Sequence, residues 1–430
     1  MEILIKNIKG LVQVEDEPVK YKAGKEMSDL RLINNAWLHI RNGLIESFGE
    51  MGDYPGDKRG IEIIDASGSF VLPSYCDSHT HIVFAGSRET EYRDKIRGLS
   101  YEEIAKRGGG ILNSSKLLQQ TTEDELYEQS MVRINEIISL GTGAVEIKSG
   151  YGLTTESELK MLRVIKRIKE NTPLAVKATF LGAHALPAEY SNDRSKYVDL
   201  VINEMIPAVA AEELADFIDV FCDKGFFTVE ETERILMAGI KYGMRPKIHA
   251  NELAFSGGIQ AGTKYEALSV DHLEFTGEEE IESLKNSETM PTLLPGASFF
   301  LGMEDPPARL MIDRGLPLAL ASDYNPGSSP SGDMKLIMSL ACIRLKLLPE
   351  EALNAASING AYAMGLSETH GSICRGKVAN VFITKEIPSF EFLPYAYGSK
   401  LVERVILNGY IVDGMPGVDL EINTNTNRTI

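Results

Sequence analysis

The 430-residue sequence predicts an α/β protein, in which a (β/α)8 TIM barrel carries a second, small β-sandwich domain built from both chain ends. Three observations predict this fold class. Eight short apolar runs end in polar residues, and segments of helical periodicity separate them, as in a barrel of alternating strands and helices. Both ends of the chain instead offer short strands with turn residues between them.

The eight predicted barrel strands follow one another along the chain. They are Phe70–His81, Ala144–Tyr151, Leu174–His184, Phe217–Lys224, Arg245–Glu252, Ala267–Glu274, Met290–Phe300 and Leu316–Asn325. Of the predicted helices between them, Glu123–Leu140 carries its apolar residues on one face, and Val229–Gly243 begins after the capping residue Thr228.

The two ends of the chain are predicted to pair into one small β domain. Its short strands are Glu2–Ile5, Trp37–Ile40, Leu44–Phe48, Val378–Thr384 and Val402–Val412. We therefore expect the small domain at residues 1–68 and 368–430 and the barrel at 69–367. Helices at Gly332–Arg344 and Pro349–Met364 lead the chain back from the barrel, and the polar tail LEINTNTNRTI is expected to be loose.

Composition excludes several classes of function. Lys and Arg total 44 against 62 Asp and Glu, and this net charge of −18 repels nucleic acid and anionic membrane surfaces. The N-terminus lacks the pattern of a signal peptide and no apolar run is long enough to span a bilayer, so a cytoplasmic location is expected. The four cysteines form no CxxC pair, which predicts free thiols.

The segment DSHTHIVFAG places His79 and His81 two residues apart, so on a strand both side chains project to the same face. An isolated HxH is more often a pair of surface histidines than a metal site. Here His249 and Asp323 also lie at the ends of predicted strands, and the C-terminal ends of barrel strands converge. Three imidazoles and a carboxylate suit zinc or iron, although each residue taken alone could be a packed core residue.

Other polar residues share this end of the predicted barrel. They are Lys148, Tyr151, His184, Asp223, Lys224, Glu252 and His272. By contrast, His39 and His370 lie outside the barrel pattern and are predicted to be surface residues. The run Arg107–Gly110 follows no strand and precedes no GK[ST], so we predict a lid over the barrel mouth and not a nucleotide-binding loop.

The motifs HTH, IHANE, SVDHLE and ASDYNPGSSP resemble those of the amidohydrolase superfamily. More narrowly, DSHTHIVFAGSRETEYRDKIRGLSYEEIAKRGGGI, EIKSGYGL and FLGAHALP are similar to the imidazolonepropionase family. The resemblance implies hydrolysis of 4-imidazolone-5-propanoate to N-formimidoyl-L-glutamate in L-histidine degradation, one Zn²⁺ or Fe²⁺/Fe³⁺ per subunit, and a homodimer. One departure, GKVANVF around Asn380, lies in the predicted small domain.

The residue chemistry suits this reaction. The metal would act as a Lewis acid, and Asp323 is the natural acceptor of the proton from the attacking water. His272 can donate to the developing oxyanion, and Glu252 is placed to hold a ring N–H. By the resemblance, the residues that contact the imidazolone are Arg88, Tyr151, His184, Glu252 and Ser328, and those that hold the opened product are Asn325, Gly327 and Tyr151.

Several alternatives stay open at this level. Without the resemblance, an ion pair of Arg88 with Glu89 or Glu91 would be favoured over substrate binding. In some superfamily members a carboxylated lysine bridges two metals, but the narrower resemblance implies one metal, so Lys148 and Lys224 are predicted to be structural or ion-paired. The other functions considered are a deaminase of a neutral purine or pyrimidine, whose substrate has no carboxylate for Arg88, and a non-catalytic assembly protein.

Overall fold

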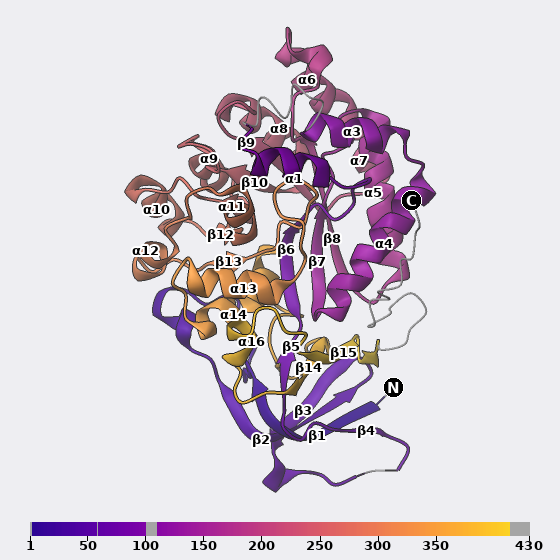
Figure 1. Ribbon diagram of the computed structural model, residues 1–430, viewed down its shortest axis with the longest axis vertical. Helices are drawn as coiled ribbons and strands as arrows, with labels where there is room; N and C mark the ends of the chain where they lie inside the picture. The colour runs from indigo at the N-terminus through magenta and orange to yellow at the C-terminus, as the bar shows by residue number, and fades with distance from the viewer. Residues whose placement is uncertain (1, 58, 100–109, 413–430) are drawn as a thin grey trace.

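The computed structural model describes residues 2–57, 59–99 and 110–412. The barrel strands are all parallel and lie side by side in chain order. They are β6 Tyr75–Thr80, β7 Thr142–Lys148, β8 Ala175–Ala183, β9 Phe217–Cys222, β10 Arg245–Ala250, β11 Ser269–His272, β12 Met290–Leu293 and β13 Ala319–Leu320. Just beyond β13, Asp323 N donates to His79 O (3.0 Å) and His81 N donates to Tyr324 O (3.0 Å), which joins the last strand to the first. The barrel fold is therefore confirmed (Figure 1).

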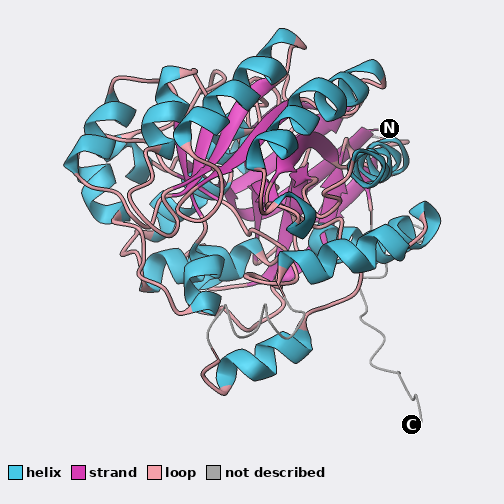
Figure 2. Cartoon of the chain, turned by 90° about the horizontal axis from the view of Figure 1, so that it is seen from above, coloured by secondary structure: helices cyan, strands magenta, loops and turns pink. Residues whose placement is uncertain are grey.

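Helices surround the strands, as the view from above shows (Figure 2). Between β6 and β13 they are α1 Glu89–Ile96, α3 Ile111–Gln120, α4 Glu123–Ser139, α5 Thr155–Asn171, α6 Arg194–Leu200, α7 Ile206–Ala211, α8 Val229–Lys241, α9 Gly258–Lys264, α10 Glu278–Lys285, α11 Pro295–Leu301 and α12 Ala308–Asp313. Those that follow β13 are α13 Met334–Ile343, α14 Pro349–Ala356, α15 Ile358–Ala363 and α16 Phe392–Tyr395. Thr228 caps α8 as predicted, because its hydroxyl accepts from Glu231 N while the Glu231 carboxylate accepts from Thr228 N.

Both ends of the chain form one mixed sheet below the barrel, where indigo and yellow strands lie side by side (Figure 1). Its strands are β1 Glu2–Val12, β2 Leu32–Arg41, β3 Leu44–Glu50, β4 Glu62–Asp65, β5 Ser69–Pro73, β14 Val381–Glu386, β15 Val402–Leu407 and β16 Tyr410–Ile411. The order is β16-β15-β14-β5-β1-β2-β3, and β4 pairs with β1. A separate apolar core, which includes Ile5, Val71 and Val381, stabilises this sheet.

Of the predicted elements that were wrong in extent, three run through a break without losing their apolar pattern. Phe70–His81 is two strands in two sheets, since β5 pairs with β1 and β14 while β6 pairs with β7. Met290–Phe300 changes from strand to helix where Pro295 opens α11. Pro349–Met364 is interrupted at Ser357, which lies outside helical geometry between α14 and α15. In each case the apolar residues continue across the break, so the hydrophobic pattern alone does not mark it.

The barrel interior holds a cluster of charges that will be called the buried charge cluster. It consists of Glu146 and Lys148 on β7, Asp219 on β9, Lys247 on β10 and Asp271 on β11, all of them 0% exposed. Barrel interiors are usually filled by branched apolar side chains. Burying charge is costly unless the charges are paired, so this cluster marks the strand ends above it as a functional region.

The four cysteines are free, as predicted. No helix among the described residues is both long and apolar enough to cross a membrane. The polar tail lies outside the described residues, and so does the predicted lid except for Gly110, which precedes α3.

The prediction that His39 and His370 are surface residues was wrong. Their exposed fractions are 7% and 8%. His39 Nε2 lies 2.7 Å from Glu2 Oε1, and His370 Nδ1 lies 2.8 Å from Thr369 Oγ1. Both are structural residues in or beside the small sheet and lie apart from the barrel mouth.

Burial, together with the nearby charge of Lys377, lowers the pKa of His370 to about 4. An unfolded histidine titrates near pH 6.5, so the unfolded chain binds more protons between these values and stability falls as the pH drops. When the pH is lowered from 7 to 4.5, we expect the free energy of unfolding to fall by roughly 2–3 kcal/mol more in the wild type than in His370→Asn. Urea unfolding of both proteins at the two pH values measures this, and a pH-independent difference between them would contradict it.

Candidate metal centre and active site

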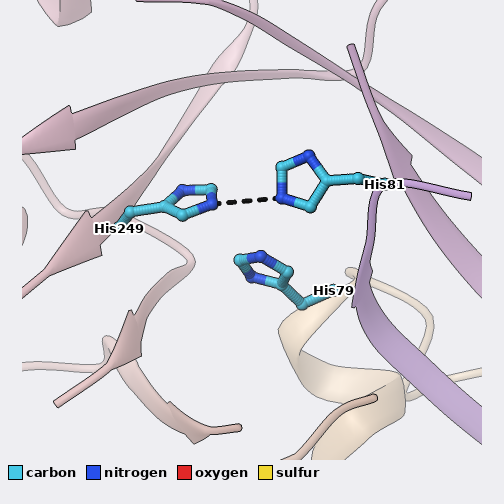
Figure 3. A group of neighbouring side chains, drawn as sticks. All are labelled: His79, His81 and His249. Carbon is cyan, nitrogen blue, oxygen red and sulfur yellow. Dashed lines mark hydrogen bonds between the residues drawn. The ribbon is translucent and has the colours of Figure 1, made fainter. Parts of the chain in front are cut away.

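Three histidines meet at the C-terminal ends of the barrel strands. His79 lies in β6, His81 directly follows it, and His249 lies in β10. One nitrogen from each ring lies within 4.8 Å of those of the other two, and His249 Nε2 is 3.3 Å from His81 Nε2 (Figure 3). All three residues are buried, with exposed fractions of 2% or less. The strand-end pattern therefore correctly placed these side chains together.

Asp323, just beyond β13, completes the group. Its Oδ1 atom lies 3.5 Å from His79 Nε2 and 3.7 Å from His81 Nε2. Its backbone has a φ of 52°, a left-handed conformation that is costly outside glycine and clusters at functional sites. His79 Nε2 has no hydrogen-bond partner among the described residues. A buried nitrogen that faces two imidazoles and a carboxylate fits a metal-binding role.

Two carboxylates orient the histidines from below. Asp271 Oδ2 lies 2.7 Å from His79 Nδ1, and Asp219 Oδ2 lies 3.0 Å from His249 Nδ1. The Asp271 contact is a hydrogen bond, and the Asp219 contact is close but lacks hydrogen-bond geometry. Both carboxylates favour the tautomer that has the proton on Nδ1 and the Nε2 lone pair toward the metal. Sequence reasoning missed both aspartates. The available signals were a carboxylate inside the apolar strand FIDVFC and a carboxylate directly before His272 in SVDH.

Lys148 lies beneath these aspartates and is ion-paired, as predicted. Its Nζ is 2.6 Å from Glu146 Oε1 and 2.8 Å from Asp219 Oδ2. Burial disfavours the ammonium, yet Asp219, Glu146 and Asp271 together raise the pKa of Lys148 above its ordinary value. A carboxylated Lys148 would add a negative charge to three carboxylates, so it does not suit a metal-bridging role. Lys224 is exposed.

Asp219 and Asp271 share the charge of Lys148, but their pKa values shift in opposite directions. Burial raises the pKa of Asp219, but His249 and Lys148 outweigh it and hold that pKa well below its usual range. For Asp271, burial outweighs Lys247 and Lys148, and the pKa is raised. The distances agree with this difference, because Lys148 Nζ is 2.8 Å from Asp219 Oδ2 and 3.5 Å from Asp271 Oδ2.

Four imidazoles at the barrel mouth, those of His79, His81, His184 and His272, are held neutral. Burial is the main reason that the pKa values of His79, His81 and His272 lie well below 6.5, and burial lowers that of His184 to about 3. Metal binding requires unprotonated imidazole. His79 and His81 are therefore in the form that binds a divalent ion.

His272 and Glu252 lie beside the metal centre, as predicted. His272 Nδ1 is 3.7 Å from Glu252 Oε2, and the His272 ring centroid is 5.3 Å from that of His249. Burial and the charge of Asp323 raise the pKa of Glu252 to about 8. The φ angles of His272 and Leu273 are 87° and 72°, which is strain of the kind found at functional sites.

Glu274 is a further carboxylate of the site that sequence reasoning did not single out. Its side chain is 1% exposed and its Oε2 atom lies 4.0 Å from His272 Nδ1. Burial, and then the charge of Glu252, raise its pKa well above the ordinary value. The sequence did offer a signal, since Glu274 ends the predicted strand that contains His272.

Tyr151 and His184 lie on the other side of His81. The rings of His81 and His184 are stacked, with centroids 5.1 Å apart, and the Tyr151 ring centroid is 5.8 Å from that of His81. His184 Nδ1 is 3.0 Å from Gly150 O. These aromatic side chains line the site beside the metal centre.

The loop after β13 brings Asn325, Gly327 and Ser328 to the same place. The Asn325 side chain accepts from Gly327 N (2.7 Å) and Ser328 N (2.8 Å), which fixes the loop as a turn. Ser328 Oγ donates to Asp323 Oδ2 (3.1 Å). Because Oδ2 is occupied, Oδ1 is the Asp323 oxygen that faces the histidines.

Arg88 makes the ion pair that was considered as an alternative, and it also reaches the site. Its Nε and Nη2 atoms donate to Glu91 Oε2 at 2.8 and 2.6 Å. The remaining Nη1 atom lies against Gly327, where a Cβ would overlap it, so a side chain at position 327 would displace the guanidinium. Arg88 also lies close enough to His184 to contribute to the lowering of its pKa. The two interactions coexist, and the Nη1 edge lies beside the predicted product-binding loop.

A family model described as "Amidohydrolase family" matches residues 70–412. "Imidazolonepropionase" of Christiangramia forsetii is 58% identical over 412 residues, which cover 96% of this chain and 100% of that protein. The protein of the same description from Flavobacterium johnsoniae is also 58% identical over 412 residues with the same coverage, and that from Clostridium tetani is 41% identical over 412 residues, covering 95% and 98%.

Solved structures resemble this one at much lower identity. A guanine deaminase from C. acetobutylicum with bound guanine has a TM-score of 0.72 at 15% identity, covering 96% of this chain and all of that one. A triazine hydrolase variant has a TM-score of 0.73 at 15% identity, covering 95% of this chain and 94% of that one. At such identity the likeness establishes the fold alone.

Proposed function

This chain belongs to the amidohydrolase family and, within it, to the imidazolonepropionases, and we propose from this membership and the site geometry that it hydrolyses the ring amide bond of 4-imidazolone-5-propanoate. The product is N-formimidoyl-L-glutamate, and the reaction is a step of L-histidine degradation. The observation that carries the mechanism is the convergence of three imidazoles and the Asp323 carboxylate on one point.

The family is metal-dependent, and we propose one divalent ion per subunit, zinc or iron, held by His79, His81, His249 and Asp323. Bound there, the ion supplies Lewis acidity toward the attacking water and the ring carbonyl. A single ion is favoured because Lys148, which contacts the aspartates behind the histidines, is already paired with carboxylates. A homodimer and a cytoplasmic location stay predictions.

The protein's own groups move the protons. Water adds to the ring carbonyl carbon, and Asp323 Oδ1, which faces the histidines, accepts the proton. The ring C–N bond then breaks, and Asp323 returns that proton to the leaving nitrogen. His272 donates to the oxygen that becomes negative in the transition state, and Glu252 accepts from a ring N–H and so orients the ring.

The substrate carboxylate needs a cation in an acidic protein. We propose that Arg88 Nη1 binds the propanoate, since Glu91 already occupies Nε and Nη2 and fixes the direction of the guanidinium. The other residues proposed to contact the ring are Tyr151, His184, Glu252 and Ser328. The opened product is held by Asn325, Gly327 and Tyr151, two of which belong to the turn beside Arg88.

A coupled assay tests this function. Urocanase generates the unstable imidazolone from urocanate, and its ultraviolet absorbance is followed after the protein is added. We expect the absorbance to fall faster than the spontaneous decay, with N-formimidoyl-L-glutamate formed in proportion. Decay at the spontaneous rate by metal-loaded protein would contradict the substrate assignment, and failure to bind metal even on supplementation would favour a non-catalytic role.

A further inference from the structure

We propose that Lys148 is a positioning residue for the metal centre, in which one buried ammonium holds the two carboxylates that orient His79 and His249. The inference rests on the proposed metal site and assigns a role to a residue that touches neither metal nor substrate. It explains why a barrel interior that could be apolar contains the buried charge cluster.

The same oxygen of each aspartate lies between the ammonium and an imidazole. Asp219 Oδ2 is 2.8 Å from Lys148 Nζ and 3.0 Å from His249 Nδ1. Asp271 Oδ2 is 3.5 Å from Lys148 Nζ and 2.7 Å from His79 Nδ1. Lys148 is therefore one carboxylate away from two of the three histidines, on two different strands.

The other oxygen of each aspartate is fixed separately. Asp219 Oδ1 accepts from His249 N (3.1 Å), and Asp271 Oδ1 accepts from Ser269 Oγ (2.5 Å). Each carboxylate is thus held at both oxygens, and Lys148 links the two. Held in this way, the carboxylates favour the tautomer whose Nε2 lone pair faces the metal.

Loss of Lys148 would leave three carboxylates beside a single ammonium, that of Lys247. Asp219 and Asp271 are both 0% exposed, and water does not reach them to replace the lost cation. Two like charges in a dry interior repel each other, so they are expected to turn apart or bind a proton. Either response weakens the contacts to His79 and His249.

Lys247 provides a matched control within the same cluster. It is also 0% exposed and also pairs with Glu146, and its remaining contacts are to Ser78 O (3.0 Å) and Ala363 O (3.2 Å). Within residues 2–57, 59–99 and 110–412, it makes no ion pair with Asp219 or Asp271, although its charge does lower the pKa of Asp271. Lys247→Met therefore removes the same charge from the cluster and leaves the link between the two aspartates intact.

The experiment compares wild type, Lys148→Met and Lys247→Met loaded with Co²⁺, whose visible spectrum reports ligand geometry. Removal of partners that orient metal ligands typically costs about 10- to 100-fold in metal affinity. We expect Lys148→Met to release Co²⁺ to a chelator faster by about that factor and to show altered visible bands. Lys247→Met should keep the wild-type bands and release rate, whatever its loss of thermal stability.

The outcomes separate the inference from the proposed function. The role of Lys148 would be overturned if Lys148→Met released Co²⁺ at the wild-type rate with wild-type visible bands, or if both variants lost Co²⁺ equally fast. Neither result would contradict the proposed metal site. Wild-type protein that binds no Co²⁺ would overturn the metal site, and the inference with it. If Lys148→Met does not fold, the double variant Glu146→Gln with Lys148→Met keeps the net charge of the cluster. The double variant should release Co²⁺ as fast as expected for Lys148→Met. If it retained Co²⁺ as the wild type does, the inference would also be overturned.

Discussion

His249→Ala is expected to lose both its bound metal and its turnover. The residue supplies one of three converging imidazoles, and its Nε2 atom lies 3.3 Å from that of His81. Lewis-acid stabilisation of a transition state contributes several kcal/mol, so loss of the ion should lower the rate by about 10³-fold or more. Metal analysis of the purified variant and the coupled imidazolone assay measure the two losses together.

A buried histidine outside the site provides the control. His39 is 7% exposed and contacts Glu2 in the small sheet, so His39→Gln tests what the loss of a packed imidazole does by itself. It should retain wild-type metal content and turnover. A His249→Ala protein with full metal content and undiminished turnover would show that these histidines do not form the metal site.

Arg88→Met is expected to lower kcat/KM for 4-imidazolone-5-propanoate by about 30-fold or more, mainly through KM. The side chain is 12% exposed, so a propanoate deprived of its cation there would stay largely desolvated and unpaired. Leaving a buried charge without its partner costs about 2–5 kcal/mol, which sets the expected size. Steady-state kinetics in the same coupled assay measure kcat and KM separately.

Lys95→Met is the matched control for this change. Lys95 is a cation on α1, the helix that begins directly after Arg88, but its Nζ donates to Phe300 O (2.5 Å) and not toward Gly327. Its loss should leave KM within about threefold of wild type, as expected for a change of roughly half a kcal/mol. An unchanged KM in Arg88→Met would remove the propanoate role and favour a neutral substrate, such as a purine or pyrimidine.

The fold was predictable because its signals are local. Eight alternating runs of strand and helix periodicity indicate a barrel, and Thr228 marks the start of α8 through contacts within one turn. The errors arose where one apolar run serves two elements. No residue within Phe70–His81 reports that β5 belongs to the small sheet and β6 to the barrel, because both strands are buried.

The grouping of the candidate metal ligands was predictable for a related reason. His79 and His81 share a strand face by their spacing, and parallel barrel strands bring their C-terminal ends to one mouth. Asp323 and His249 could therefore be grouped with them without knowing any distance. The ion pair of Arg88 with Glu91 was also foreseeable, since residues three apart meet on a helix.

The local sequence thus predicts the kinds of chemical group at the barrel mouth and the strand ends that carry them. Which buried charges pair depends on contacts between distant parts of the folded chain. Lys148 contacts Asp219, 71 residues away, and His79 contacts Asp271, 192 residues away. The hydrophobic periodicity of a strand shows which face a side chain occupies. The residue that lies opposite it across a closed barrel depends instead on the register of strands that are distant in the sequence. That register joins one lysine, through two aspartates, to two histidines of the proposed metal centre.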